Sequence, residues 1–189
     1  TLPFLKWIKN YPTTRAIEET SDKAISNSKY SLLLPWVCLF AIFLTYINIG
    51  AYWTYIELAA LDSNINPNLV SEVLVWASLC SLLGCLFATL LSNRFGLLRP
   101  LLMALFTMAM GVGMLAFGIN EPRFLMSVFT FSLLWVFTDV YQMGSLANFD
   151  NGGHYAAYLP AAQGLGQIVG PNLAASLLGL SLGYQSVFI

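Results

Sequence analysis

Five apolar stretches dominate this chain, and each is long enough to cross a lipid bilayer. They run over residues 32–60, 69–91, 98–119, 124–147 and 155–182. A membrane-spanning helix needs about 20 mostly apolar residues, and none of the stretches alternates like a barrel strand. Charged residues make up 9% of the chain, whereas a soluble domain carries about 25%. The sequence therefore predicts an all-α membrane protein, a polytopic helical bundle of five full spans.

The distribution of cations predicts how these helices are oriented. Most of the Lys and Arg residues precede the first apolar stretch. The others are Arg94, Arg99 and Arg123. Cytoplasmic flanks of membrane proteins collect Lys and Arg, so we expect residues 1–30 on the cytoplasmic side. Successive crossings then place residues 62–68 outside and residues 92–97 inside. The expected location is the plasma membrane, or the inner membrane of a bacterium.

The two ends of the sequence are expected to adjoin further segments. Residues 1–30 are polar and are predicted to be a cytoplasmic linker. Leu5, Trp7 and Ile8 form an amphipathic patch there, and the alternative is that this patch lies on a membrane surface. Residues 183–189 predict a turn followed by the first turn of a sixth span. Residues 31–189 are thus expected to form the helical bundle, with its sixth span truncated.

The first stretch carries a polar and aromatic surface. Tyr46, Trp53 and Glu57 fall on one helical face by their spacing, and Asn48 lies on an adjoining face. Lipid does not solvate such side chains in mid-helix, so we expect them to face protein or a water-filled cavity. The alternative places Trp53 and Glu57 in an aromatic belt at the outer interface. That alternative does not account for Tyr46 and Asn48, which are predicted near the middle of the span.

Asp139 is the most costly residue in the predicted membrane region. A carboxylate at the centre of a spanning helix costs roughly 2.5–3.5 kcal/mol on insertion scales. The five stretches hold no Lys or Arg other than Arg99, which lies at the loop end of the third. Asp139 is therefore expected to be neutral, to reach water, or to meet a cation from outside this chain. Trp135 and Gln142 share its helical face, which predicts a pathway or a proton-carrying surface. The alternative is a carboxyl that is hydrogen-bonded within the bundle.

The fifth stretch is rich in glycine, proline and amides. Gly166 and Gly170 have the G-x-x-x-G spacing that lets two helix backbones touch. Pro160 and Pro171 are expected to interrupt the hydrogen-bond ladder on each side. The amides are Gln163, Gln167 and Asn172. A broken, glycine-rich helix with buried amides is typical of the moving segment of a transporter. The alternative is a kinked helix that serves only packing.

Residues for metal, redox or covalent chemistry are few. Cys38, Cys80 and Cys85 lie in apolar stretches without metal-ligand spacing, so we expect them to be small core residues. His154 is the only histidine and falls in a connector. An intramembrane enzyme would need a nucleophile and base or a set of metal ligands. We therefore expect no enzyme activity, no metal site and no cofactor.

Two segments resemble motifs of the major facilitator superfamily of transporters. Residues 160–171 (PAAQGLGQIVGP), which follow the connector 150–154 (DNGGH), resemble the eleventh helix and the loop before it. Residues 91–100 (LSNRFGLLRP) resemble the cytoplasmic Asp-Arg-x-Gly-Arg signature between helices eight and nine. Arg94 and Gly96 match this signature. The departures from the family pattern are Asn93 in place of Asp, Leu97 in place of the second Arg, and His154 where Arg is frequent.

The resemblance covers residues from about 31 to 189. It implies the C-terminal half of a twelve-helix transporter, with helices seven to eleven and the start of helix twelve. It also implies transport of a small organic solute by alternating access, coupled to an ion such as the proton. The predicted pathway residues are Tyr46, Asn48, Trp53, Glu57, Trp135, Asp139 and Gln142. The predicted packing and gating residues are Arg94, Gly96, Gln163, Gly166, Gly170 and Pro171.

The expected partners follow from these predictions. They are a small-molecule substrate, protons, the lipid bilayer and the N-terminal six-helix half that this sequence lacks. No nucleic-acid partner is expected. The alternative function is a multi-pass membrane scaffold or receptor without transport, and the intramembrane enzyme is a third.

Overall fold

The structure, a computed structural model, describes residues 28–92, 96–150, 153–180 and 183–188. The chain divides into two units, Thr1–Leu34 and Pro35–Ile189. Most of the first unit, which holds the predicted linker, lies outside the described residues. The packing that positions the candidate site belongs to the second unit.

All of the described secondary structure is helical. The α-helices are α3 (Ser28–Asp62), α4 (Pro67–Ser92), α5 (Leu98–Ala116), α6 (Glu121–Phe149) and α7 (Leu159–Gly179). Two short 3-10 helices, η2 (Ala156–Tyr158) and η3 (Tyr184–Phe188), precede and follow α7. Each of the five apolar stretches therefore contains one long helix, and the all-α prediction is confirmed.

Four of the long helices, α3 to α6, are long and apolar enough to cross a membrane. The prediction of five spans is confirmed to this extent. The fifth stretch forms α7, a helix of 21 residues, but its amides, glycines and prolines lower its mean hydropathy. A crossing by α7 therefore stays a prediction.

Asparagine side chains cap the N-terminal ends of two of the helices. The Asn66 side chain accepts a hydrogen bond from the backbone at the start of α4, where Pro67 is the first helical residue. Asn120 caps α6 in the same way, because its side-chain oxygen accepts from the Arg123 N–H at 3.1 Å. Pro122 in the first turn of α6 needs no intrahelical donor there. These caps set the register with which α4 and α6 enter the bundle.

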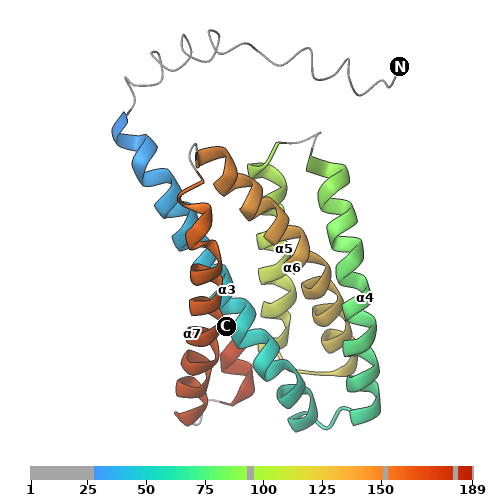
Figure 1. Cartoon of the computed structure of the whole chain (residues 1–189). Helices are drawn as coiled ribbons and strands as arrows, with labels where there is room; N and C mark the ends of the chain where they lie inside the picture. The colour runs from blue at the N-terminus through green and yellow to red at the C-terminus, as the bar shows by residue number, and fades with distance from the viewer. Residues whose placement is uncertain (1–27, 93–95, 151–152, 181–182, 189) are drawn as a thin grey trace, which may run out of the picture. The chain divides into compact units, whose positions relative to one another are not determined.

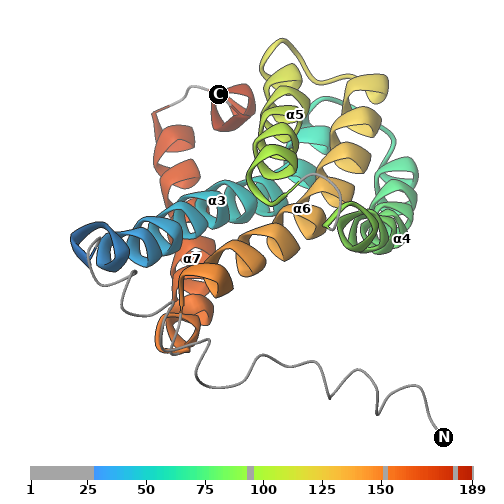
Figure 2. The same cartoon turned by 90° about the horizontal axis from the view of Figure 1, so that it is seen from above.

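Successive helices run in alternating directions. The C-terminal ends of α4 and α6 lie at one end of the bundle, and those of α3 and α5 lie at the other (Figure 1). Viewed from above, α3 crosses α7 and extends in among α4, α5 and α6 (Figure 2). α3 therefore packs both on α7 and on the rest of the bundle.

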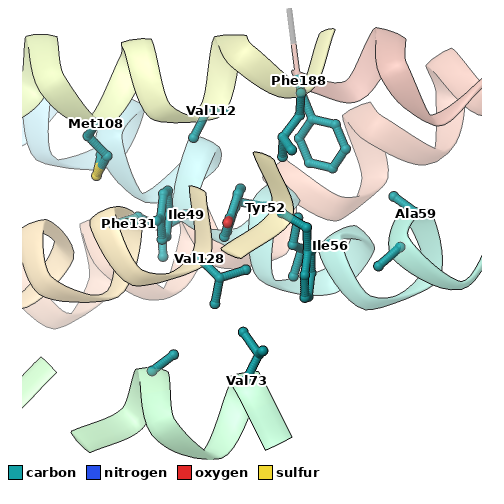
Figure 3. Packing of buried hydrophobic residues seen from close by; sticks show 14 of the residues in the cluster. Ile49, Tyr52, Ile56, Ala59, Val73, Met108, Val112, Val128, Phe131 and Phe188 are labelled. Atoms are coloured by element: carbon teal, nitrogen blue, oxygen red, sulfur yellow. The ribbon is translucent and has the colours of Figure 1, made fainter. Parts of the chain in front are cut away.

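The core is built around one aromatic residue of α3. The buried Tyr52 ring stacks on Phe131 of α6 with ring centroids 3.8 Å apart. Phe188 of η3 packs edge-on against the same ring at 6.0 Å. Val128 of α6 and Val73 of α4 face each other on the other side of this cluster (Figure 3). Because the core joins α3, α4, α6 and η3, it supplies a fixed frame beside the polar site.

Candidate functional site

Three helices meet at Asp139 of α6. The Tyr46 hydroxyl of α3 donates a hydrogen bond to Asp139 Oδ1 at 2.7 Å. The Gln163 amide of α7 donates to the same oxygen at 3.0 Å. Tyr46 is buried and Asp139 is half-buried. The carboxyl is thus hydrogen-bonded within the bundle, which is the arrangement that the alternative interpretation of Asp139 expected. Two neutral donors, rather than a cation, meet it.

A second link between α3 and α6 lies close to the first. Gln142 of α6 is buried and donates from its side-chain amide to Thr45 Oγ1 at 2.8 Å. The Thr45 hydroxyl in turn donates to the Ala41 carbonyl at 2.9 Å, so it is free to accept. The side-chain oxygen of Gln142 is buried without a protein partner among the described residues. Gln142 therefore joins α3 to α6 but does not contact Asp139 through this bond.

Two tryptophans line the space next to this junction. The rings of Trp53 on α3 and Trp135 on α6 have centroids 5.8 Å apart. Both border a hollow of about 280 Å³, which Gln167 of α7 and Thr54 of α3 also line. The indole N–H of Trp53 is buried and has no protein partner in the described part of the chain.

The same two tryptophans border a smaller hollow toward α4. Its volume is about 210 Å³, and Ser78 and Ser81 of α4 lie on its wall. Both serine hydroxyls donate to backbone carbonyls of their own helix, at 3.0 and 2.7 Å. Sequence analysis missed these serines. Their spacing of three residues in an otherwise apolar stretch was the available signal.

Glycines on both helices bring α3 and α7 into backbone contact. A Cβ atom added at Gly166 would lie 2.6 Å from the Tyr46 Cβ, and one added at Gly50 would lie 2.9 Å from the Gln167 backbone. A Cβ at Gly170 would overlap a backbone carbonyl of α3. The close approach that the G-x-x-x-G spacing predicts is therefore present, with Gly50 as an additional member. The gating role predicted for these residues stays a prediction.

The predicted interruption of this helix is wrong. α7 is one continuous helix with Pro171 in its interior. Pro160 lies in the first turn, where a helix needs no N–H donor. Pro171 cannot donate to the Gln167 carbonyl one turn earlier, but that carbonyl lies against Gly50 of α3. The helix therefore continues through its proline where it packs on α3. Gln167 and Asn172 are exposed in this chain rather than buried, and only Gln163 reaches Asp139.

Other predicted residues lie away from Asp139. Asn48 is exposed on another face of α3, where it lines a separate hollow with Gly170. Glu57 is exposed toward the C-terminal end of α3. Arg94 lies outside the described residues. Gly96 precedes α5 with a φ of 70°, a conformation that favours glycine.

Comparisons with protein-family models, with curated proteins and with solved structures find no match to this chain. Within the described ranges, no group of three His, Cys, Asp or Glu side chains is arranged to hold a metal ion. The argument for a function therefore depends on the geometry around Asp139 and on the contact between α3 and α7.

Proposed function

We propose that this chain is the C-terminal half of a secondary active transporter of the major facilitator type. It moves a small organic solute across the membrane by alternating access, coupled to protons. One observation carries the proposal: Asp139 is joined to α3 and to α7 by hydrogen bonds, beside the paired indoles of Trp53 and Trp135.

The outer faces of the helices support a membrane location. Large apolar side chains are exposed there, among them Leu82 at 63%, Met103 at 71% and Phe106 at 70%. A soluble monomer rarely exposes extended apolar surface of this kind, whereas acyl chains solvate it. We propose that α3 to α7 cross the plasma membrane and that the N-terminal segment is cytoplasmic.

The hydrogen bonds at Asp139 suggest how a proton can act on the helices. A hydrogen bond to an ionised carboxylate is roughly twice as strong as one between neutral groups. Protonation of Asp139 therefore weakens each of its two bonds by about 1 kcal/mol. Only the Gln163 bond joins Asp139 to α7, so its weakening shifts the balance between joined and separated α7 about fivefold, since 1.4 kcal/mol is a factor of about ten. A proton on Asp139 thus favours release of α7.

The contact between α3 and α7 supports α7 as the element that moves. Small residues let the two backbones touch without side chains that interlock. Besides the Gln163 bond to Asp139, the Tyr55 hydroxyl donates weakly to the Pro171 carbonyl at 3.4 Å. Within the described part of the chain, these are the hydrogen bonds that a displacement of α7 breaks. The displacement also widens the 280 Å³ hollow, because Gln167 of α7 forms part of its wall.

The walls of this hollow favour an aromatic or cationic solute. The indole faces attract a cation and the nearby carboxylate complements its charge. The volume of about 280 Å³ is close to the lower limit of typical ligand sites, which span roughly 300–1,000 Å³. We therefore choose ethidium, a planar aromatic cation, as the first probe, and benzoate, an aromatic anion, as its counterpart.

The test uses the full-length protein in sealed vesicles under an imposed proton gradient. We expect ethidium flux and accompanying proton movement above those of empty vesicles. Asp139→Asn should abolish proton-driven flux and retain ethidium exchange at equal pH. Glu72→Gln changes an exposed carboxyl of α4 and should behave as wild type. Driven flux at the wild-type level in Asp139→Asn would contradict the proton role, and loss of both activities would assign Asp139 to binding or folding.

A further inference from the structure

A hollow of about 420 Å³ opens between α4, α5 and α6, apart from the residues that surround Asp139. Met103 and Ala104 of α5 and Leu134 and Phe137 of α6 lie on its walls. Thr107 also lines it, but its hydroxyl donates to the Met103 carbonyl at 2.8 Å. The walls are therefore apolar, and the charged residue among those that line this hollow is Arg99.

The position of Arg99 matches the level of lipid headgroups. α5 has 19 residues, which corresponds to about 28 Å of helix and to a hydrocarbon core of about 30 Å. Arg99 is the second residue of α5 and is exposed. No side chain caps the start of this helix, so its N–H groups add positive potential beside the guanidinium. The lining residues from Arg99 to Thr107 extend along the helix for about 12 Å.

We propose that this hollow binds one acyl chain of an anionic phospholipid, whose phosphate contacts Arg99. Charge complementarity selects this occupant, because a cation stands at the headgroup end of an elongated apolar channel. The inference rests on the membrane location proposed above and not on transport. Loss of lipid binding and loss of solute flux are measured separately, so either can fail alone.

Native mass spectrometry of the detergent-purified full-length protein tests the headgroup contact. The probes are palmitoyl-oleoyl phosphatidylglycerol and phosphatidylcholine, which have the same chains and differ in charge. We expect phosphatidylglycerol to be retained about fivefold better, the effect of one cation near an anionic lipid. Arg99→Gln should remove this preference and Arg99→Lys should keep it. An unchanged preference in Arg99→Gln would overturn the proposal, as would displacement of the lipid by excess inorganic phosphate.

A matched pair of variants tests the acyl-chain contact. Met103 lines the hollow and Phe106 does not, although both are exposed on α5 to a similar degree, 71% and 70%. Met103→Trp should reduce retention of both lipids by filling the hollow. Phe106→Trp should leave retention unchanged. Equal retention in the two variants would overturn the proposal, and neither variant replaces a buried side chain.

Discussion

Glycines bring the backbones together in two helix contacts of this bundle, α3 with α7 and α4 with α6. The side chains around the two contacts differ. Between α3 and α7, Gly50, Gly166 and Gly170 remove the side chains that would keep the backbones apart. Between α4 and α6, Gly84 does the same against the Leu133 carbonyl. Close backbone approach is therefore common to both contacts.

The surroundings of the two contacts are opposite in character. Buried apolar side chains lie along the same pair of helices, with Val73 and Ala77 on α4 and Val128 on α6. Such side chains interlock and resist displacement. Beside the α3–α7 contact, α7 is held by two hydrogen bonds, from Gln163 to Asp139 of α6 and from Tyr55 of α3 to the Pro171 carbonyl. Because hydrogen bonds can be broken and remade, we propose that α4 and α6 belong to a fixed frame and that α7 is the part that moves.

The largest effect is expected when a methyl group is added at each contact. Gly170→Ala and Gly84→Ala both place a Cβ onto a backbone carbonyl, so each should lower the free energy of unfolding by about 1–3 kcal/mol. Ethidium flux per folded molecule should fall at least tenfold in Gly170→Ala and stay near wild type in Gly84→Ala. Thermal unfolding in detergent and vesicle flux measure the two quantities.

The control for this pair is Gly164→Ala. A Cβ at Gly164 meets open space, and alanine favours a helix over glycine by up to about 1 kcal/mol. The variant should therefore be as stable as wild type or more stable. Equal losses of flux in Gly170→Ala and Gly84→Ala would break the distinction between the two contacts.

A smaller effect is expected for the amides of α7. Gln163→Leu removes one donor to Asp139 and should cost about 1–3 kcal/mol of unfolding free energy, the usual cost of losing a charged hydrogen bond. Gln167 does not bond to Asp139, so Gln167→Leu should keep the stability of the wild type. It should raise the KM for ethidium, because Gln167 lines the hollow. Unfolding curves and flux at several ethidium concentrations separate the two outcomes. Similar unfolding curves for both variants would show that Gln163 does not hold α7.

The smallest effect is expected for Tyr52, one of two tyrosines of α3 that bond to α6. The Tyr46 hydroxyl contacts Asp139 at 2.7 Å, and the Tyr52 hydroxyl lies 3.0 Å from Ser127 Oγ. Tyr52→Phe should cost about 1 kcal/mol of unfolding free energy, and Tyr46→Phe about 1–3 kcal/mol, because its partner is the carboxyl that Gln163 also bonds. Only Tyr46→Phe should alter how ethidium flux depends on pH. A changed pH profile in Tyr52→Phe would place the proton-sensitive group elsewhere.

The fold was largely predictable because apolar stretches mark the helices. The residues at which the helices begin and end were less predictable. α5 ends at Ala116, before the predicted residue 119, and is followed by Gly118 with a φ of 116°. α6 begins at Glu121 because Asn120 caps it, although its apolar stretch begins at residue 124. Local capping and backbone conformation, which hydropathy does not record, decide these boundaries.

The candidate site was predictable within each helix and not between helices. Spacing along one helix placed Trp135 on the same face as Asp139. Asp139 itself was predicted as a site residue because it is a lone carboxyl in an apolar stretch. Which residue of another helix meets it depends on the register of packing. The sequence therefore could not select Gln163 over Gln167 as its partner. Asn48 is exposed while Tyr46 is buried, because residues two apart point to different sides of a helix.

We propose that the protonation state of Asp139 decides whether α7 is joined to the rest of the bundle. Pulsed electron paramagnetic resonance of the full-length protein in lipid nanodiscs tests it most directly. The spin labels replace two exposed residues, Met143 of α6 and Leu173 of α7, after Ala replaces Cys38, Cys80 and Cys85. In a control pair, the labels replace Met143 and the exposed Leu82 of α4.

The account predicts two distances between α6 and α7, with the longer one gaining population as the pH falls. Asp139→Asn should show the longer distance at every pH, and the control distance between α4 and α6 should not change. A single distance between α6 and α7 that is insensitive both to pH and to Asp139→Asn would contradict the account.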